Sequence, residues 1–345
     1  MKATNVITLL LAATVGMLPL SAQEPAQTTL QAIALAKNSK KPAKLVLVPP
    51  PSIAKGVFSY HDPTEPEPPV ASTKDYRFLV IMTPAELVKA IRSYADDSLA
   101  DAKKQLAAVR SKYAPFVALP NNPSMRAGLM ELSCLARLQD WAALGDLAQN
   151  FPGGKAMLEA SDRVLLDAAA LLSQVTDSPA EAAELRKKIE AFLADSSKVS
   201  QLHSDGHVWL KYALGRCLAA ESALTGQQKG GLTPEKEKTA NLAVDAYCEA
   251  AMNAHGHNME LPVDAMKRAF AILWAMPGVK DYAASVKTMD KKQWTAAPHY
   301  FRDAVSLAYM LQNVFAPGIK DAAISQAAAL HFNTAKGKKK AQPKQ

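Results

Sequence analysis

The sequence lacks the motifs that most enzyme classes require. No Gly-x-Ser-x-Gly nucleophile motif occurs, and Gly153-Gly154-Lys155 has neither the full spacing of a phosphate-binding loop nor a preceding strand, so we expect a turn there. Aromatic residues make up 6% of the chain, which leaves few side chains on which nucleic-acid bases could stack. We therefore expect no catalytic residues, no cofactor and no enzymatic activity.

Long apolar runs are absent after the N-terminus. Lys2 precedes the apolar segment Val6–Leu20, which is followed by the small residues Ser21-Ala22 and the polar Gln23. This pattern is typical of a secretory signal peptide, and the apolar segment is short for a retained membrane anchor, which is the less favoured alternative. We therefore expect residues 1–22 to be a signal peptide. The mature chain is then exported to the periplasm or cell envelope, or secreted, and has no transmembrane segment.

Positive charge is concentrated at the C-terminus. The chain carries 40 lysines and arginines against 32 aspartates and glutamates, a formal net charge of +8. Five of the lysines lie in residues 336–345, which contain no acid, whereas residues 84–335 carry equal numbers of bases and acids. A nucleic-acid-binding domain normally has a basic face, so we expect no binding to nucleic acid. For residues 336–345 we favour a basic disordered tail over a docking site.

Prolines are concentrated ahead of the main body of the chain. Eight of the 22 prolines lie between Pro42 and Pro69, a composition that favours an extended linker or arm. Two apolar runs, Lys44–Val48 and Tyr76–Met82, are rich in β-branched and aromatic residues and predict short strands, which either pair or lie against the body. We expect a proline-rich arm over residues 23–82 and a helical domain over residues 83–335.

Helix starts are marked in the second part of the chain. Thr83-Pro84-Ala85-Glu86 and Ser178-Pro179-Ala180-Glu181 each combine an N-cap hydroxyl, a first-turn proline and a glutamate that could close a capping box. Thr233-Pro234-Glu235 is a partial version. Apolar residues recur at helical spacing, and alternation of period two is absent after Met82. These patterns predict an all-α body.

The helical segments predict five antiparallel hairpins. Breaks between partner helices fall near residues 140, 178, 230, 277 and 318. Each hairpin has two apolar stripes and needs neighbours on both sides to bury them, which predicts a stack. The predicted pairs are Met125–Gln139 with Trp141–Phe151, Asp162–Val175 with Pro179–Ala194, Gly206–Thr225 with Pro234–Ala254, Val263–Ala275 with Val279–Met289, and His299–Phe315 with Lys320–Phe332.

Over roughly residues 125–332 the chain resembles tetratricopeptide repeats. Tyr212-Ala213-Leu214-Gly215 is similar to the first helix of that repeat, with its leucine–glycine pair, and Asp140-Trp141 resembles the pair that opens a second helix. Ala243, Tyr247 and Ala250 match the packing positions of the second helix. The period exceeds the family's length of about 34 residues, and the hallmark residues are incomplete in every unit. The resemblance implies stacked antiparallel helical hairpins, a tetratricopeptide-like α-solenoid, preceded by the proline-rich arm.

Two pairs of histidines have spacings that metal sites use. His255 and His257 precede Glu260, but no further ligand is tied to them. The tetratricopeptide resemblance places them in a loop between hairpins, which we favour over a metal site. His203 and His207 lie four residues apart, and there we favour the start of a helix over a ligand pair. We therefore expect no metal site.

Cysteines and tryptophans are few. Export permits disulfides, but pairing Gly215 with Ala243, as the resemblance implies, leaves Cys217 and Cys248 seven residues out of register, about 10 Å of helix rise. We expect three free, buried thiols, the third at Cys134. Three of the four tryptophans fit apolar helical stripes, so core packing is favoured over a sugar-binding groove for Trp141, Trp209, Trp274 and Trp294.

Two classes of function remain. A stack of helical hairpins presents an extended concave face, so we expect a scaffold that binds a protein or peptide partner in the cell envelope. The alternative is an all-α glycan-binding or carbohydrate-active protein, which would need positioned carboxylates and aromatic platforms. The low aromatic content disfavours this alternative. Aromatic side chains with facing carboxylates in the largest surface groove would favour it.

Overall fold

The chain divides into two compact units, Met1–Met82 and Thr83–Gln345. The computed structural model describes residues 30–36, 44–48, 57–59, 70–72, 76–80, 84–114, 122–223, 232–254 and 258–332. The division between the units falls where proline-rich sequence gives way to sequence rich in alanine and leucine. The expected signal peptide and the expected basic tail both lie outside the described residues.

The described residues of the first unit form two small antiparallel sheets. In the larger sheet, β1 (Leu30–Ala36) lies between β2 (Lys44–Val48) and β5 (Tyr76–Val80). Ala32 of β1 is opposite Val46 on one side and Val80 on the other. In the smaller sheet, β3 (Val57–Ser59) pairs with β4 (Val70–Ser72). The two predicted strands are therefore present, but each pairs with β1 and not with the other.

The strand β3 lies inside the proline-rich stretch. Residues 52–62 contain no proline, and Val57 and Phe58 are β-branched and aromatic residues of the kind that strands favour. Its partner β4 starts at Val70, directly after Pro69, a position where the missing backbone N–H of proline does not interrupt the ladder. The backbone of this stretch therefore forms paired strands where prolines are absent.

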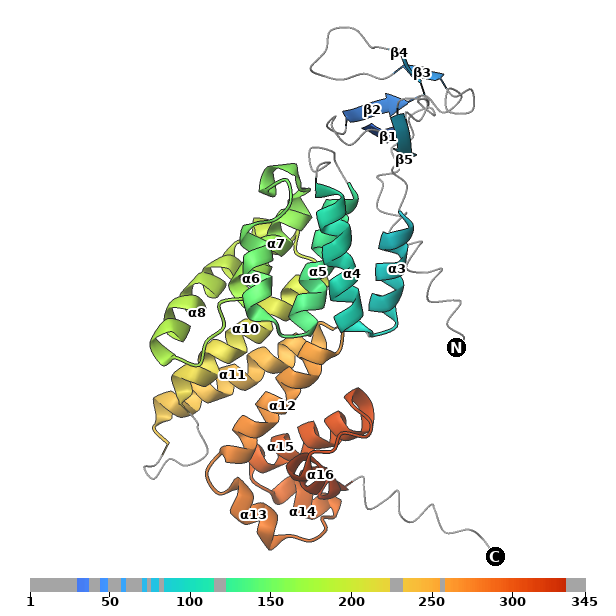
Figure 1. Ribbon diagram of the computed structural model, residues 1–345. Helices are drawn as coiled ribbons and strands as arrows, with labels where there is room; N and C mark the ends of the chain where they lie inside the picture. Colours follow the sequence, from blue (N-terminus) through green and yellow to red (C-terminus); the bar gives the residue numbers. More distant parts are fainter. Residues whose placement is uncertain are drawn as a thin grey trace, which may run out of the picture. The chain divides into compact units, whose positions relative to one another are not determined.

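Helices form all the described secondary structure of the second unit (Figure 1). The expectation of an all-α body is confirmed for these residues. The elements are α3 (Ala85–Ala95), α4 (Leu99–Lys112), α5 (Pro123–Arg137), α6 (Trp141–Gln149), η2 (Lys155–Met157), α7 (Ala160–Leu172), α8 (Pro179–Ala194), α9 (Ser196–Val199), α10 (Ser204–Ser222), α11 (Pro234–Met252), α12 (Glu260–Ala275), α13 (Val279–Ser285), α14 (Lys291–Ala296), α15 (His299–Met310), the π-helical turn η3 (Leu311–Phe315) and α16 (Ala322–Ala329).

Several predicted helix bounds lie two to four residues from the observed ones, and two local predictions are wrong. The segment Val279–Met289 is not one helix, because α13 ends at Ser285 and α14 starts after a capping box between Asp290 and Gln293. The capping box predicted at Ser178 is absent, since Ser178 makes no side-chain cap and Glu181 accepts a hydrogen bond from the Thr176 hydroxyl at 2.9 Å. A capping-box sequence therefore does not ensure a capping box, because its side chains can bond to other partners instead.

The pair α10 and α11 occupies the centre of the helical unit and its core. Helix α10 packs against α7, α8, α11 and α12, and Figure 1 shows α10 and α11 side by side. Tyr212 of α10 and Tyr247 of α11 are fully buried, with ring centroids 6.0 Å apart. The Tyr212 hydroxyl donates to Asp264 of α12 at 2.6 Å, which ties a third helix to the pair.

The three cysteines are free, as the sequence predicts. Cys134 and Cys217 are buried, whereas Cys248 is half-buried, so the expectation that all three are buried is wrong for Cys248. Burial raises the pKa of Cys134 to about 11 and that of Cys217 to about 12. Both buried thiols are therefore protonated at neutral pH and poorly reactive as nucleophiles.

Candidate functional site

The histidine pair before α10 lies at the start of that helix. His203 occupies the N-cap position and His207 lies in the first turn. The Nε2 atom of His203 is 3.7 Å from Asp162 Oδ1, and hydrogen bonding to Asp162 raises the pKa of His203. The structure thus gives His203 a carboxylate partner on α7 and provides no evidence that the two rings share a metal.

The second histidine pair, His255 and His257, lies outside the described residues. Glu260, the third residue of that pattern, is the first residue of α12, and both of its carboxylate oxygens accept hydrogen bonds from Arg137. Among the described residues, no group of three or more histidines, cysteines, aspartates or glutamates could hold a metal ion.

The glycine pair Gly153-Gly154 forms a turn. Both residues have a left-handed backbone, with φ of 74° and 72°, and Lys155 then starts the short helix η2. The Lys155 ammonium pairs with Asp167, so it is held by the protein's own carboxylate. Of the four tryptophans, Trp209 is 3% exposed, and the rest pack half-buried against the core: Trp141, Trp274 and Trp294.

Arg137 of α5 is the centre of a buried polar cluster. Its side chain is 5% exposed, and its guanidinium donates to Glu260 at 2.7 and 2.6 Å and to Asp97 at 2.6 Å. The guanidinium also lies over the ring of Tyr94, 4.9 Å from the centroid. Burial lowers the pKa of Arg137, but hydrogen bonds to Glu260 and Asp97 outweigh burial, so the pKa is raised. The guanidinium therefore joins three separate segments of chain.

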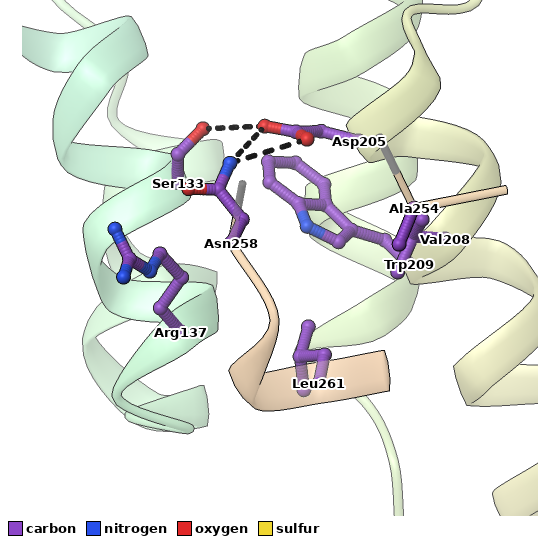
Figure 2. Close-up of a pocket in the computed structure, with 8 residues that line it drawn as sticks. All are labelled: Ser133, Arg137, Asp205, Val208, Trp209, Ala254, Asn258 and Leu261. Carbon is purple, nitrogen blue, oxygen red and sulfur yellow. Dashed lines mark hydrogen bonds between the residues drawn. The ribbon is translucent and has the colours of Figure 1, made fainter. Parts of the chain in front are cut away.

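The same cluster extends to Asp205 of α10 (Figure 2). Asp205 accepts hydrogen bonds from the Ser133 hydroxyl at 3.3 Å and from the Asn258 amide at 3.1 and 3.3 Å, and Figure 2 shows both donors pointing toward its carboxylate. Asn258 in turn accepts from the Tyr94 hydroxyl at 2.7 Å. The space enclosed here is about 20 Å³, which suits one water molecule and excludes a substrate. We interpret the cluster as a structural joint between helices.

A larger groove, with a volume of about 420 Å³, is open to solvent between α11 and α15. Leu273 of α12 also lines the groove. One wall consists of residues spaced three to four apart on α11, namely Asn241, Val244, Asp245 and Cys248. The other wall follows the same spacing along α15: His299, Tyr300, Asp303, Ser306, Leu307 and Met310. Each helix therefore presents one face to the groove.

Tyr300, a lining residue on α15, is hydrogen-bonded to α11. Its hydroxyl accepts a hydrogen bond from the Asn241 amide at 2.8 Å and donates to Glu237 at 2.6 Å. These bonds join α11 to α15. Burial raises the pKa of Tyr300, and its hydrogen bond to Glu237 adds to the effect. The phenol is thus protonated at neutral pH and holds the two walls together.

Cys248 lies in the groove as a protonated thiol. Burial raises its pKa, and the nearby carboxylates of Asp245, Asp303 and Glu249 raise it further. Because the thiolate is the nucleophilic form, this surrounding disfavours cysteine catalysis. The groove therefore offers carboxylates and apolar contact, and the structure shows no activated nucleophile in it.

None of the described helices combines the length and the apolar character that a membrane span requires. Comparisons of this chain with protein-family models, with curated proteins and with solved structures find no match.

Proposed function

We propose that the chain is an exported helical-repeat scaffold that binds a protein or peptide partner in the cell envelope, on the concave face of its stacked hairpins. Export rests on the signal-peptide pattern of residues 1–22. The observation that carries the binding function is the open groove between α11 and α15, about 420 Å³ in volume. Two rows of side chains on two helices suit an extended or helical peptide better than a small molecule.

Close packing of α10 on α11 supports the tetratricopeptide-like part of the proposal. A Cβ atom added to Gly215 would lie 2.6 Å from the ring of Tyr247, so only glycine allows this approach. Ala243 and Ala250, one turn on either side of Tyr247, are fully buried. The resemblance implies Gly215 opposite Ala243, but the structure places Gly215 against Tyr247, one turn further along α11, so the implied register is wrong although the same residue types meet. These contacts favour a repeat of that type over an unrelated helical bundle.

In-cell crosslinking tests the scaffold proposal. The tagged chain is crosslinked in its native host, purified, and its neighbours are identified by mass spectrometry. We expect a specific envelope protein with the unchanged chain, and several-fold lower recovery with Asp303→Lys, which reverses a charge in the groove. Asp281→Lys, an exposed reversal on α13 outside the groove, is the matched control and should recover the neighbour normally. Equal recovery by both variants would remove the groove from the proposal.

One observation favours the glycan alternative as a second candidate. The groove combines an aromatic side chain, Tyr300, with Asp245 and Asp303 on opposite walls. Against it, the Tyr300 hydroxyl is already bonded at both its donor and its acceptor, and no tryptophan is among the groove's lining residues. Binding to a polysaccharide array, together with recovery of no protein neighbour, would replace the scaffold by a glycan-binding function.

A further inference from the structure

The groove carries negative charge and can therefore bind basic groups. Asp245 and Asp303 are exposed on its opposite walls, and in the part of the chain that the structure describes neither is paired with a lysine or arginine. The nearby Glu249 differs, because it pairs with Lys211. Two unpaired carboxylates that face one space can each receive a cationic side chain without the cost of breaking an existing pair.

The same groove also has apolar lining residues. Val244, Leu273 and Leu307 are among its lining residues. Met310 is 41% exposed at the end of α15, where the chain passes into the π-helical turn η3. Methionine side chains adapt to differently shaped apolar partners, and π-helical turns are frequent at functional sites. The groove therefore also offers contact area for a bulky apolar side chain.

We propose that the partner segment is a basic amphipathic peptide, in which lysine or arginine side chains flank at least one bulky apolar side chain. This inference rests on the proposed scaffold function and names the chemistry of its partner. The cationic groups bind Asp245 and Asp303, and the apolar side chain packs on Val244, Leu273 and Leu307. A helix with apolar residues at a spacing of three to four matches the spacing of both walls.

The chain's own C-terminus matches this chemistry only in part. Residues 333–345 hold Lys336, Lys338, Lys339, Lys340 and Lys344 and no acid. Alanine and proline are the largest apolar residues of that segment, so it has no bulky side chain to pack on the apolar lining residues of the groove. A separate partner that carries leucine, phenylalanine or a similar residue fits both properties of the groove. Occupation by the tail is the competing outcome that the experiment must separate.

Binding of a synthetic peptide to the purified chain provides the test. The probe is a fluorescein-labelled peptide of about sixteen residues with leucines at helical spacing and lysines elsewhere, measured by fluorescence anisotropy at low salt. Two matched peptides replace either all leucines by alanine or all lysines by glutamate. We expect the leucine–lysine peptide to bind, the alanine peptide to bind about tenfold more weakly or worse, and the glutamate peptide not to bind.

Variants of the chain locate the peptide. The double variant Asp245→Asn with Asp303→Asn should weaken binding by about tenfold, because each surface carboxylate contributes modestly. Asp281→Asn with Glu159→Gln removes the same charge from exposed positions outside the groove and should leave affinity unchanged. Equal losses in both double variants would show diffuse attraction of a cationic peptide and would overturn the inference.

Alkylation of the cysteines gives a second, independent readout. Cys248 lines the groove and is half-buried, whereas the buried Cys134 and Cys217 serve as internal controls. Bound peptide should slow the reaction of Cys248 with N-ethylmaleimide several-fold and leave the other two rates unchanged. Unchanged alkylation of Cys248 at saturating peptide would place the peptide elsewhere and contradict the inference.

A chain truncated before Asn333 distinguishes a separate partner from the chain's own C-terminal tail as the occupant of the groove. We expect the truncated chain to bind the leucine–lysine peptide at least as tightly as the full chain. If the peptide binds neither chain and a labelled peptide of residues 333–345 protects Cys248 in the truncated chain, the tail is the occupant and the inference is wrong. Failure of the peptide alongside recovery of an envelope neighbour by crosslinking would reject this partner chemistry while the scaffold function stands.

Discussion

The Arg137 cluster allows a prediction that separates two ion pairs of the same guanidinium. Glu260 receives two hydrogen bonds from Arg137 and is 35% exposed, whereas Asp97 receives one and is 77% exposed. We expect Glu260→Gln to lower the free energy of unfolding much more than Asp97→Asn. The control is well matched, because Asp97 has a left-handed backbone with φ of 58°, which asparagine adopts as readily as aspartate.

The magnitudes follow from burial. Removing one partner of a buried ion pair costs about 3–5 kcal/mol, and a hydrogen bond to a charged group contributes about 1.5–3 kcal/mol. Glu260→Gln keeps one acceptor oxygen but places an amide N–H against the guanidinium, and partial exposure of Glu260 lets water compensate in part. We therefore expect a loss of about 2–3 kcal/mol for Glu260→Gln. For the mostly exposed Asp97, a loss below about 1 kcal/mol is expected for Asp97→Asn.

Urea unfolding at pH 7, followed by circular dichroism of the helices, measures both values through the shift of the midpoint at constant slope. The chain contains two units, but the helical signal reports the second unit, to which every residue of the Arg137 cluster belongs. A loss for Glu260→Gln within about 0.5 kcal/mol of zero, or a loss for Asp97→Asn as large as that for Glu260→Gln, would refute the assignment of Arg137 as a buried charge held mainly by Glu260.

Three further substitutions test the packing of the core and the dependence of stability on pH. Tyr247→Phe should raise the free energy of unfolding by about 1 kcal/mol in urea titrations, because the Tyr247 hydroxyl is buried and has no hydrogen-bond partner in the described part of the chain. A lower free energy of unfolding would mean that the hydroxyl does have a partner. Gly215→Ala should lower the free energy of unfolding by about 1–3 kcal/mol, because the added methyl group would clash with the Tyr247 ring. An unchanged urea midpoint would contradict the close packing of α10 on α11. The raised pKa of His203 stabilises the fold below its unfolded pKa, and this contribution is lost as pH rises through the folded pKa, so Asp162→Asn should lower the melting temperature at pH 5.5 and have little effect at pH 8.

Helix starts are the features of the fold that local sequence predicts best. The predicted starts at Trp141, Pro179, Pro234, Val279 and His299 coincide with the observed ones. Proline in the first turn explains two of them, because its fixed φ suits that position and its missing N–H has no intrahelical partner to lose. Thr233 also caps α11, accepting a hydrogen bond from the Lys236 backbone at 3.3 Å. These signals act over four residues, so they do not depend on the rest of the fold.

The strand β1 forms although its local sequence favours a helix. Its sequence, Leu-Gln-Ala-Ile-Ala-Leu-Ala, consists mostly of good helix formers and carries no strand signal of its own. It is extended because β2 and β5 pair with it on both sides. The sequence of each of these partners predicts a strand, whereas that of the strand between them does not. Pairing energy from neighbours, which no local pattern contains, overrides the helix preference of β1.

The candidate groove and the Arg137 cluster were beyond prediction for the same physical reason. Helical periodicity indicates which residues share a face of one helix, but not which two faces meet. Asn241 and Tyr300 join the groove walls across 59 residues of sequence, and Arg137 binds Glu260 across 123. In isolation, Asp245 and Asp303 are ordinary exposed residues of two helices. They become a candidate site only because α11 and α15 are brought together, through the packing of both helices on α12 and through the hydrogen bond between Asn241 and Tyr300.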